Sequence, residues 1–424
     1  MPTPPRPTCL FVLTCLALTV RTLAADAVVP SPRPWEPDAF LPVTEARIAA
    51  LPAGEQPGWR AYWQASVERS HLLPERDLVD HSSTKPLAGP PIGSSYSKGV
   101  KLGAPAAWYA TEEARTIADK VVKWQRPTGG WVKSGDYSRD PEAKDDHHDA
   151  WSNGTFDNDS TIYELRFLAL VAQAAGADPR AQAWRDSFLR GLDYIFAAQY
   201  PNGGFPQIYP LVGWYHDAIT FNDDAMVHIL ELCRDIAGRQ AEFAFVPAAN
   251  AERARQAEAR GIQCVLATQL RAPDGHRTIW GQQHDPLTLK PCAARNFEPI
   301  SECSLESAGL TQFLMTVPAP GPEIVGAIDS AMAWFPAHAL HGVVWDRDVA
   351  TGNALVPRAG APELWARYYE IGTGRPVFGE RDRMVHYNVT ELSLERRKGY
   401  GWFNSRATAL PAAYAKWKAQ LAAK

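Results

Sequence analysis

The feature that most constrains the fold of this 424-residue chain is an internal repeat. From residue 111 onward, stretches with helical periodicity end in a glutamine, which a glycine-containing turn and an aromatic residue follow. The three copies are Lys123–Trp131, Ala198–Phe205 and Thr268–Trp280, and a degenerate fourth copy is expected at Ile328–Leu340. The glutamines Gln125, Gln199 and Gln269 are 74 and 70 residues apart, which gives each unit room for two helices. A pair of helices cannot bury both of its faces alone, whereas three or more stacked pairs can.

Local signals agree with a helical interpretation. Pro127 and Pro201 stop the first helix of their units, and the glycines after them supply positive φ angles. The second helix of the first unit is predicted to begin with a capping box at Thr161–Glu164, before apolar residues at helical spacing. Runs of alternating polar and apolar residues are scarce, so few strands are expected. The sequence therefore predicts an all-α fold.

The N-terminal segment has the pattern of a secretory signal peptide. A 12-residue apolar run, Cys9–Val20, follows a short stretch with one arginine, and the small residues of 23–27 follow at cleavage spacing. We expect residues 1–25 to be removed and the protein to be secreted, either to the periplasm or outside the cell; the alternative is an unusual N-terminal core segment. No apolar run reaches the ~18 residues of a membrane helix, so no membrane association is expected after cleavage.

The rest of the chain divides into two parts. Residues 26–100 are rich in proline, glycine and serine, and short helices are expected near Val43–Leu51 and Gly58–Ser70. This segment has too little core to fold alone, so it is predicted to form an irregular wrap over the main domain. The main domain is predicted to span residues 101–424.

Composition excludes several classes of protein. With 46% hydrophobic and 21% charged residues, the chain is neither disordered nor collagen-like. A formal net charge of −4 provides no global positive field for nucleic acid. The motifs of nucleotide binding, serine hydrolysis and zinc proteolysis are absent from the sequence. Cys292 and Cys303 are close enough in sequence to form a disulfide, but buried free thiols are equally plausible.

Two related acidic clusters are the first candidate site. Asp157–Asp159 and Asn222–Asp224 each precede a predicted helix at the same end of consecutive units, so they could face one another across a cleft. Helix capping needs one carboxylate or amide, and each cluster offers three. The surplus favours a hard cation such as Ca²⁺, with plain capping as the alternative. The run Asp145–Asp149 could also bind a metal, but a charged loop tip is the simpler interpretation.

Arginines beside aromatic residues are the second candidate site. They are Arg295, Arg367, Arg375 and Arg381, which lie near Tyr, Trp or Phe residues. Guanidinium groups on an aromatic floor suit bidentate recognition of carboxylates. The alternative is ordinary surface ion pairing, for instance of Arg381 with Asp382 or Glu380.

Seven longer strings, in order along roughly residues 105–405, are similar to those of the pectate lyases of polysaccharide lyase family 10. The strings are Trp124–Trp131, Asp157–Thr161, Tyr200–Pro206, Ile219–Asp224, Trp280–Pro286, Ala294–Glu298 and Tyr368–Gly372. The resemblance implies an (α/α)₃ toroid of repeated helical hairpins, with few short strands and a cleft along its face. This agrees with the repeat.

The resemblance also implies a reaction, the calcium-dependent anti β-elimination of α-1,4-polygalacturonate to 4,5-unsaturated oligogalacturonates. The C5 proton is weakly acidic because its removal places a second negative charge on the adjacent carboxylate. Ca²⁺ and arginine stabilise that charge. By the resemblance, Arg295 aligns with the catalytic base. Arg367 and Arg381 are similar in position to the arginines that bind the substrate carboxylate.

The acidic clusters match the residues near calcium in that family. These are Asp157, Asn158 and Asp223, of which Asp157 is also expected to contact substrate. Whether Asp223 or its neighbour Asp224 is the ligand stays open. The pKa of an arginine normally exceeds about 12. Nearby cations, Arg367, Arg381 and Ca²⁺, are expected to lower the pKa of Arg295, and the scarce neutral form predicts alkaline activity.

Two other functions would use the same residues. An inverting glycoside hydrolase would employ Asp157 and Asp223 as acid and base, with their carboxyl groups ~6.5–9.5 Å apart. A non-catalytic pectin-binding protein would bind the saccharide tightly without cleaving any bond. In each case we expect a monomer with an acidic polysaccharide as its partner and no nucleic acid.

Overall fold

The structure, a computed structural model, describes residues 30–36, 40–73, 99–100, 102–133, 135–142, 153–347 and 352–423. The predicted signal peptide of residues 1–25 and the charged run Asp145–Asp149 lie outside these ranges, and so does much of the predicted wrap segment. Ser31–Lys424 form one compact unit. Within the described ranges, none of the helices combines the length and apolarity that crossing a membrane requires.

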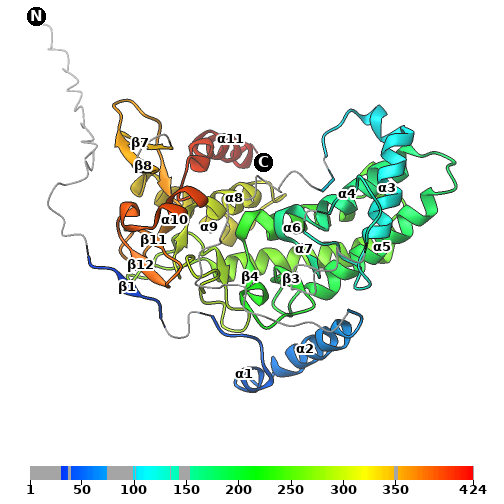
Figure 1. Ribbon diagram of the computed structural model, residues 1–424, viewed down its shortest axis with the longest axis horizontal. Coiled ribbons are helices and arrows are strands. Elements are labelled where there is room, and N and C mark those ends of the chain that lie inside the picture. Colours follow the sequence, from blue (N-terminus) through cyan, green and yellow to red (C-terminus); the bar gives the residue numbers. More distant parts are fainter. Residues whose placement is uncertain are drawn as a thin grey trace, which may run out of the picture. The chain divides into compact units, whose positions relative to one another are not determined.

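Helical hairpins dominate this unit, as the repeat predicted. The first helices of the repeat units are α3 (Glu112–Trp124), α5 (Ala181–Ala198), α7 (Ala248–Thr268) and α9 (Pro322–Ala337). The second helices are α4 (Ile162–Ala174), α6 (Ala225–Ala237), α8 (Ser304–Met315) and α11 (Leu410–Ala422). The closest helix pairs are α4 with α5, α6 with α7 and α8 with α9, so each hairpin joins the second helix of one unit to the first helix of the next. First helices also pack against first helices of neighbouring units, and α4, α6 and α8 pack in series (Figure 1). The arrangement buries the faces that a single hairpin would expose.

The repeat glutamines join consecutive units. The side-chain Nε2 of each glutamine donates one hydrogen bond to a carbonyl of its own turn and one to a carbonyl of the next first helix. The sets are Gln125 with Gly129 and Ser187, Gln199 with Gly203 and Ala257, and Gln269 with Thr278 and Ala327, at 2.7–3.0 Å. The glutamine is therefore a repeated feature because it ties the end of one helix to the flank of the next.

A tryptophan after the turn marks the units in a second way. The indole Nε1 donates to a backbone carbonyl near the end of the preceding first helix, in the pairs Trp131 with Val121, Trp280 with Val265 and Trp365 with Phe335. The last pair places the predicted fourth copy, Ile328–Leu340, on α9. That copy is degenerate because no glutamine ends its helix.

Short strands connect each unit to the next. They pair as β2 (Gly154–Thr155) with β3 (Ile208–Tyr209), β4 (Ile219–Thr220) with β5 (Gln283–His284), and β6 (Glu302–Cys303) with β10 (Tyr368–Tyr369). In each pair the first strand leads toward a second helix, and the partner strand belongs to the following unit. Gln207, Gln282 and Arg367 directly precede the partner strands and so occupy equivalent positions.

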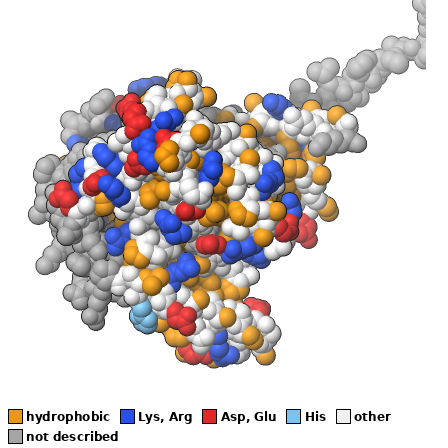
Figure 2. Space-filling model, turned by 90° about the vertical axis from the view of Figure 1, so that its right-hand side faces the viewer, with side chains coloured by type: hydrophobic (Ala, Val, Ile, Leu, Met, Phe, Trp, Pro, Cys, Tyr) orange, Lys and Arg blue, Asp and Glu red, His pale blue; other side chains and the backbone are white. Residues whose placement is uncertain are grey.

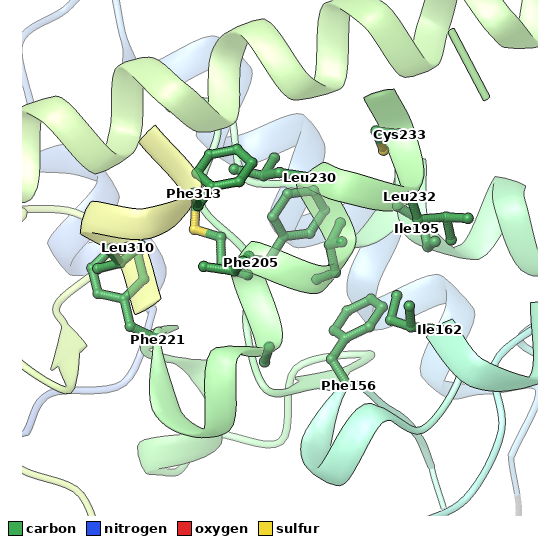
Figure 3. Close-up of a cluster of buried hydrophobic side chains, with 14 of the residues drawn as sticks. Phe156, Ile162, Ile195, Phe205, Phe221, Leu230, Leu232, Cys233, Leu310 and Phe313 are labelled. Atoms are coloured by element: carbon green, nitrogen blue, oxygen red, sulfur yellow. The ribbon is translucent and has the colours of Figure 1, made fainter. Parts of the chain in front are cut away.

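Buried phenylalanines anchor the segments between β2 and α4 and between β4 and α6. Phe156 and Phe221 are fully buried, and the Phe156 ring packs edge-on against that of Phe205 at 6.1 Å. Figure 3 shows these rings among side chains contributed by several units, including Leu230 and Phe313. The anchors fix the positions of the acidic residues that follow each phenylalanine.

The predicted capping box at Thr161–Glu164 is wrong. The Thr161 hydroxyl does not cap α4 but accepts a hydrogen bond from the Trp131 N–H at 3.0 Å. Glu164 is buried and accepts from the Tyr137 hydroxyl at 2.7 Å. Burial raises the pKa of Glu164 to about 7. A tertiary contact across the turn therefore replaces the local cap.

The C-terminal part carries the longest strands. A five-stranded sheet has the order β1 (Arg33–Pro34), β12 (Met384–His386), β11 (Pro376–Gly379), β10 and β6. β7 (Val343–Asp346) pairs with β8 (Ala354–Pro357), and β9 (Trp365–Ala366) pairs with β13 (Phe403–Asn404); the short helix α10 spans Leu394–Gly399. The strands are two to four residues long.

The described N-terminal residues contain the two expected helices, α1 (Glu45–Ala49) and α2 (Gln56–Ser70). From α2, Trp59 packs against Tyr200 with ring centroids 5.3 Å apart. Cys292 and Cys303 are buried free thiols, so the disulfide alternative is wrong.

We expect Gln199→Ala to lower the free energy of unfolding by about 2–3 kcal/mol, because two buried carbonyls lose their donor. Gln256→Ala is the matched control, since Gln256 is an exposed glutamine of α7 and its loss is expected to cost no more than about 0.5 kcal/mol. Denaturant unfolding of both variants tests this. Equal losses in the two variants would contradict the linking role of Gln199.

Candidate active site

The acidic segments and the return strands converge on one pocket of about 310 Å³. Its lining consists of Lys133, Asp157, Asn158, Gln207, Tyr215, Asn222, Asp223, Gln282, Gln283, Arg295, Glu298, Arg367, Gly399, Tyr400 and Gly401. Of the six residues given a role by the family resemblance, five are therefore brought together and Arg381 is not; Arg375 is also absent from the lining. The equivalent repeat positions 207, 282 and 367 all contribute.

The two acidic clusters form 3₁₀ turns of the same geometry, η5 (Asp157–Asp159) and η7 (Asn222–Asp224). The middle residue of each has a positive φ, 49° at Asn158 and 51° at Asp223. Asn and Asp tolerate this left-handed conformation better than most residues. The shared geometry makes Asn158 and Asp223 equivalent, and both line the pocket.

The third residue of each turn points elsewhere. Asp159 pairs with His228 at 2.5 Å, and Asp224 pairs with Arg406 at 2.7 Å. Of the two adjacent aspartates that the sequence could not separate, Asp223 lines the pocket and Asp224 is held by an arginine outside its lining.

Asp157 lies at the bottom of the η5 side of the pocket and is only 3% exposed. Its Oδ1 accepts from the side-chain Nε2 of Gln207 at 3.1 Å, and its Oδ2 forms an ion pair with Lys133. Sequence analysis assigned no role to Lys133.

Asp223, on the η7 side, is more exposed. Its Oδ2 accepts from Asn222 at 2.7 Å, and its Oδ1 lies 4.0 Å from Arg367 Nη2. Burial raises the pKa of Asp223, although the Arg367 guanidinium favours the ionised form. Asn222 therefore connects Asp223 to the arginine side of the pocket, because its Oδ1 accepts from Arg367 at 3.3 Å.

Arg367 is a buried arginine with a buried partner. Its Nη2 donates to Glu306, a residue of the first turn of α8 that is 1% exposed. The face of Tyr400 lies 5.0 Å from the guanidinium carbon. Nothing in the sequence distinguished Glu306 from an ordinary acidic residue near a helix N-terminus.

Arg295 is held by Glu298 through three contacts. Its backbone N–H, Nε and Nη2 donate to the carboxylate at 3.0, 2.9 and 2.6 Å, and the Tyr400 hydroxyl donates to the same group at 2.6 Å. Burial lowers the pKa of Arg295, but the Glu298 carboxylate outweighs burial and holds that pKa well above its usual range. The nearest charge to Arg295 is thus negative, and the expected lowering of its pKa by Arg367 and Arg381 is not found in the described structure, while the effect of Ca²⁺ stays a prediction.

Arg381 is bonded outside the pocket. Its Nε and Nη2 donate to Glu395 of α10 at 2.9 and 3.0 Å, while its backbone N–H donates to Glu380. Its guanidinium carbon lies 5.6 Å from the Phe297 ring. The ring of Phe297 also lies 5.1 Å from the guanidinium carbon of Arg295. The contact of Arg381 with substrate stays a prediction.

The donors on the pocket suit a hard cation in part. Among the described residues, no group of three or more His, Cys, Asp or Glu side chains is placed to hold a metal ion. The lining does offer carboxylate and amide oxygens from Asp157, Asn158 and Asp223. Gln207 also lines the pocket, and its Oε1 is buried and has no hydrogen-bond partner among the described residues. An oxygen-only set of this kind is what Ca²⁺ prefers, with the remaining ligands coming from water or a bound molecule.

Comparison with known proteins identifies the family. A family model described as pectic acid lyase matches residues 125–410. The chain belongs to the pectic acid lyase family. Two solved structures agree with this assignment, and the search of curated proteins finds no match.

Both solved structures are family 10 polysaccharide lyases from Cellvibrio cellulosa. One covers 76% of this chain and 99% of its own, with 34% identity and a TM-score of 0.65. The other, a point mutant in complex with trigalacturonic acid, covers 74% and 97%, with 34% identity and a TM-score of 0.64. The predictions of an (α/α)₃ toroid and of a pectate lyase are confirmed.

In this pectate lyase we expect Glu306→Gln to lower kcat/KM at least tenfold, because Arg367 loses its charged partner and its fixed orientation. Removing one member of a buried ion pair is also expected to cost about 3 kcal/mol of stability. Glu323→Gln, an exposed acidic residue at the start of α9, is the matched control. Steady-state kinetics and thermal unfolding measure the two effects, and wild-type kinetics for Glu306→Gln would contradict the assignment.

Proposed function

We propose that the chain is a secreted, calcium-dependent, monomeric pectate lyase that cleaves α-1,4-polygalacturonate by anti β-elimination. The observation that carries the proposal is the convergence of Arg295 and Arg367 with Asp157, Asn158 and Asp223 on one pocket. A related lyase structure holds trigalacturonic acid, which supports an oligogalacturonate as substrate. The apolar run Cys9–Val20 supports secretion.

Arg367 is suited to hold the carboxylate of the reacting sugar. Its Nε is buried and has no hydrogen-bond partner among the described residues, so a donor is available for an anionic ligand. Glu306 and the ring of Tyr400 fix the guanidinium plane. A fixed guanidinium stabilises the negative charge that builds up on the carboxylate as the C5 proton leaves.

Asp157, Asn158 and Asp223 are the residues that would hold calcium. Bound calcium would supply further electrostatic stabilisation of the substrate carboxylate. The positive φ of Asn158 and Asp223 turns the two middle residues of η5 and η7 into the same pocket, so the protein sets the spacing of its ligands through the two anchored turns.

Arg295 would act as the base in its neutral form. The C5 proton passes to Arg295. The electron pair of the broken C5–H bond forms the C4–C5 double bond, and the C4–O bond breaks. The leaving oxygen takes a proton from water. Because Glu298 stabilises the charged form of Arg295, the neutral form is scarce, and the rate is expected to rise with pH.

Incubation with polygalacturonate tests the proposed function. We expect ultraviolet absorbance from the unsaturated product to increase at alkaline pH with Ca²⁺ and to stop when a chelator is added, because the dianion-like transition state loses a counter-ion. Excess Ca²⁺ restores the rate in the control. Reducing ends without absorbance would indicate hydrolysis by Asp157 and Asp223, and tight binding without cleavage would indicate a binding protein.

We expect Glu298→Gln to move the alkaline rise of kcat/KM to lower pH by about one unit or more. The sign follows from the charge: the carboxylate raises the pKa of Arg295, so its removal lowers that pKa and increases the neutral fraction at each pH. Glu395→Gln, which removes the partner of Arg381 instead, is the control. A reduced rate with an unshifted pH profile would show that Glu298 only supports the local structure.

A further inference from the structure

We propose that Lys133 is a resident counter-ion of Asp157 that calcium must displace, and that the released ammonium then pairs with the carboxylate of a neighbouring sugar of the substrate. This deepens the proposed function and rests on it. Lys133 would thereby couple the binding of calcium to the binding of polygalacturonate.

The first support is that both carboxylate oxygens of Asp157 already have partners. Lys133 Nζ pairs with Oδ2, and Gln207 Nε2 donates to Oδ1 at 3.1 Å. With a side-chain exposure of 3%, Asp157 has little access to water for further ligands. Calcium at Oδ2 of Asp157 would lie against the ammonium, and the repulsion between the two cations favours displacement of the lysine.

The second support is the freedom of Lys133 to move. Its backbone follows Trp131, whose N–H is bonded to Thr161 and whose indole is bonded to Val121, so the start of the side chain is fixed. The side chain itself is 27% exposed and lines the pocket. A lysine carries its charge at the end of a flexible stem that can rotate toward a new partner, whereas Arg295 is fixed by several nitrogen donors bonded to one carboxylate at once.

The third support is the charge balance of the pocket. Arg295 is matched by Glu298 and Arg367 by Glu306, with both carboxylates almost fully buried. Lys133 matches Asp157. Asp223 remains, 4.0 Å from an arginine that already has a closer partner.

A dication in this pocket would overcompensate the remaining charge and leave the ammonium without its partner. One substrate carboxylate directed at Lys133 removes that excess. Polygalacturonate carries a carboxylate on every sugar, so a chain that places one carboxylate at Arg367 has another available for Lys133. Each ligand should therefore bind more tightly when the other is present, by the same factor.

Titration calorimetry of the full chain with CaCl₂ alone, and with CaCl₂ plus trigalacturonate, tests the inference. We expect Lys133→Met to bind Ca²⁺ about tenfold more tightly than wild type without sugar, and to bind trigalacturonate more weakly with Ca²⁺. In Lys133→Met, we expect Ca²⁺ to increase the affinity for trigalacturonate, and trigalacturonate to increase the affinity for Ca²⁺, by a smaller factor than in wild type. Lys133→Arg is expected to keep the carboxylate contact and to restore part of the sugar affinity.

Lys123→Met is the matched control, because Lys123 forms an exposed ion pair with Asp140 away from the pocket, and neither affinity should change. Lys133→Gln serves as a second variant if the thermal unfolding of Lys133→Met shows a damaged fold. Weaker binding of both ligands, or unchanged Ca²⁺ affinity in a folded variant, would mean that Lys133 is only a structural clamp and would overturn the inference. Failure of wild type and both variants to bind Ca²⁺ would overturn the calcium dependence of the proposed function together with this inference.

Discussion

The arrangement of the pocket depends on how one repeat unit is tied to the next. The repeat glutamines bond across units, and the strand that leads into each second helix pairs with a return strand of the following unit. These bonds fix the ends of successive hairpins relative to one another. Asp157 and Asp223, 66 residues apart, and Arg367, further along, consequently line one cavity. On the face in Figure 2, Lys and Arg are interspersed with Asp and Glu, so that face has no large patch of one sign of charge.

Function arises where the repeat departs from its own pattern. Gln207, Gln282 and Arg367 hold equivalent backbone positions, and only the third is charged. In the third unit α8 begins directly after β6, without the 3₁₀ turn found in the first two units. Glu306 therefore falls inside the first helical turn, where it is buried against Arg367 instead of facing the pocket as Asn158 and Asp223 do. Because the third unit lacks the 3₁₀ turn, it contributes no carboxylate or amide oxygen of that turn to the pocket. It contributes instead the Glu306 carboxylate, which holds Arg367 in place.

Sequence reasoning recovered what is encoded locally. The spacing of the glutamines predicted the hairpins, and the shared pattern of the two acidic clusters predicted that Asp157, Asn158 and Asp223 meet. Partners from distant segments were not predictable, because no spacing relates Glu306 to Arg367 or marks Lys133 as the partner of Asp157. The capping box failed for the same reason: a backbone N–H from across the turn competes for the Thr161 hydroxyl. Arg381 matched the family pattern, yet the position of Glu395 was needed to see that its guanidinium is bonded outside the pocket lining.

Without substrate, the described pocket contains three close ion pairs, Arg295 with Glu298, Arg367 with Glu306 and Lys133 with Asp157. They differ in how readily one partner can be replaced by a ligand. Glu298 binds Arg295 through three nitrogen donors and also accepts from Tyr400, while Glu306 is enclosed with Arg367. Separating either pair would leave a charge deep in the protein, which costs several kcal/mol. Asp157 is as buried as Glu298, so the Lys133 ammonium can leave it only when another cation takes its place. Calcium is that cation in the proposed exchange, so the lysine pair is the one that exchanges while the two arginine pairs keep their geometry.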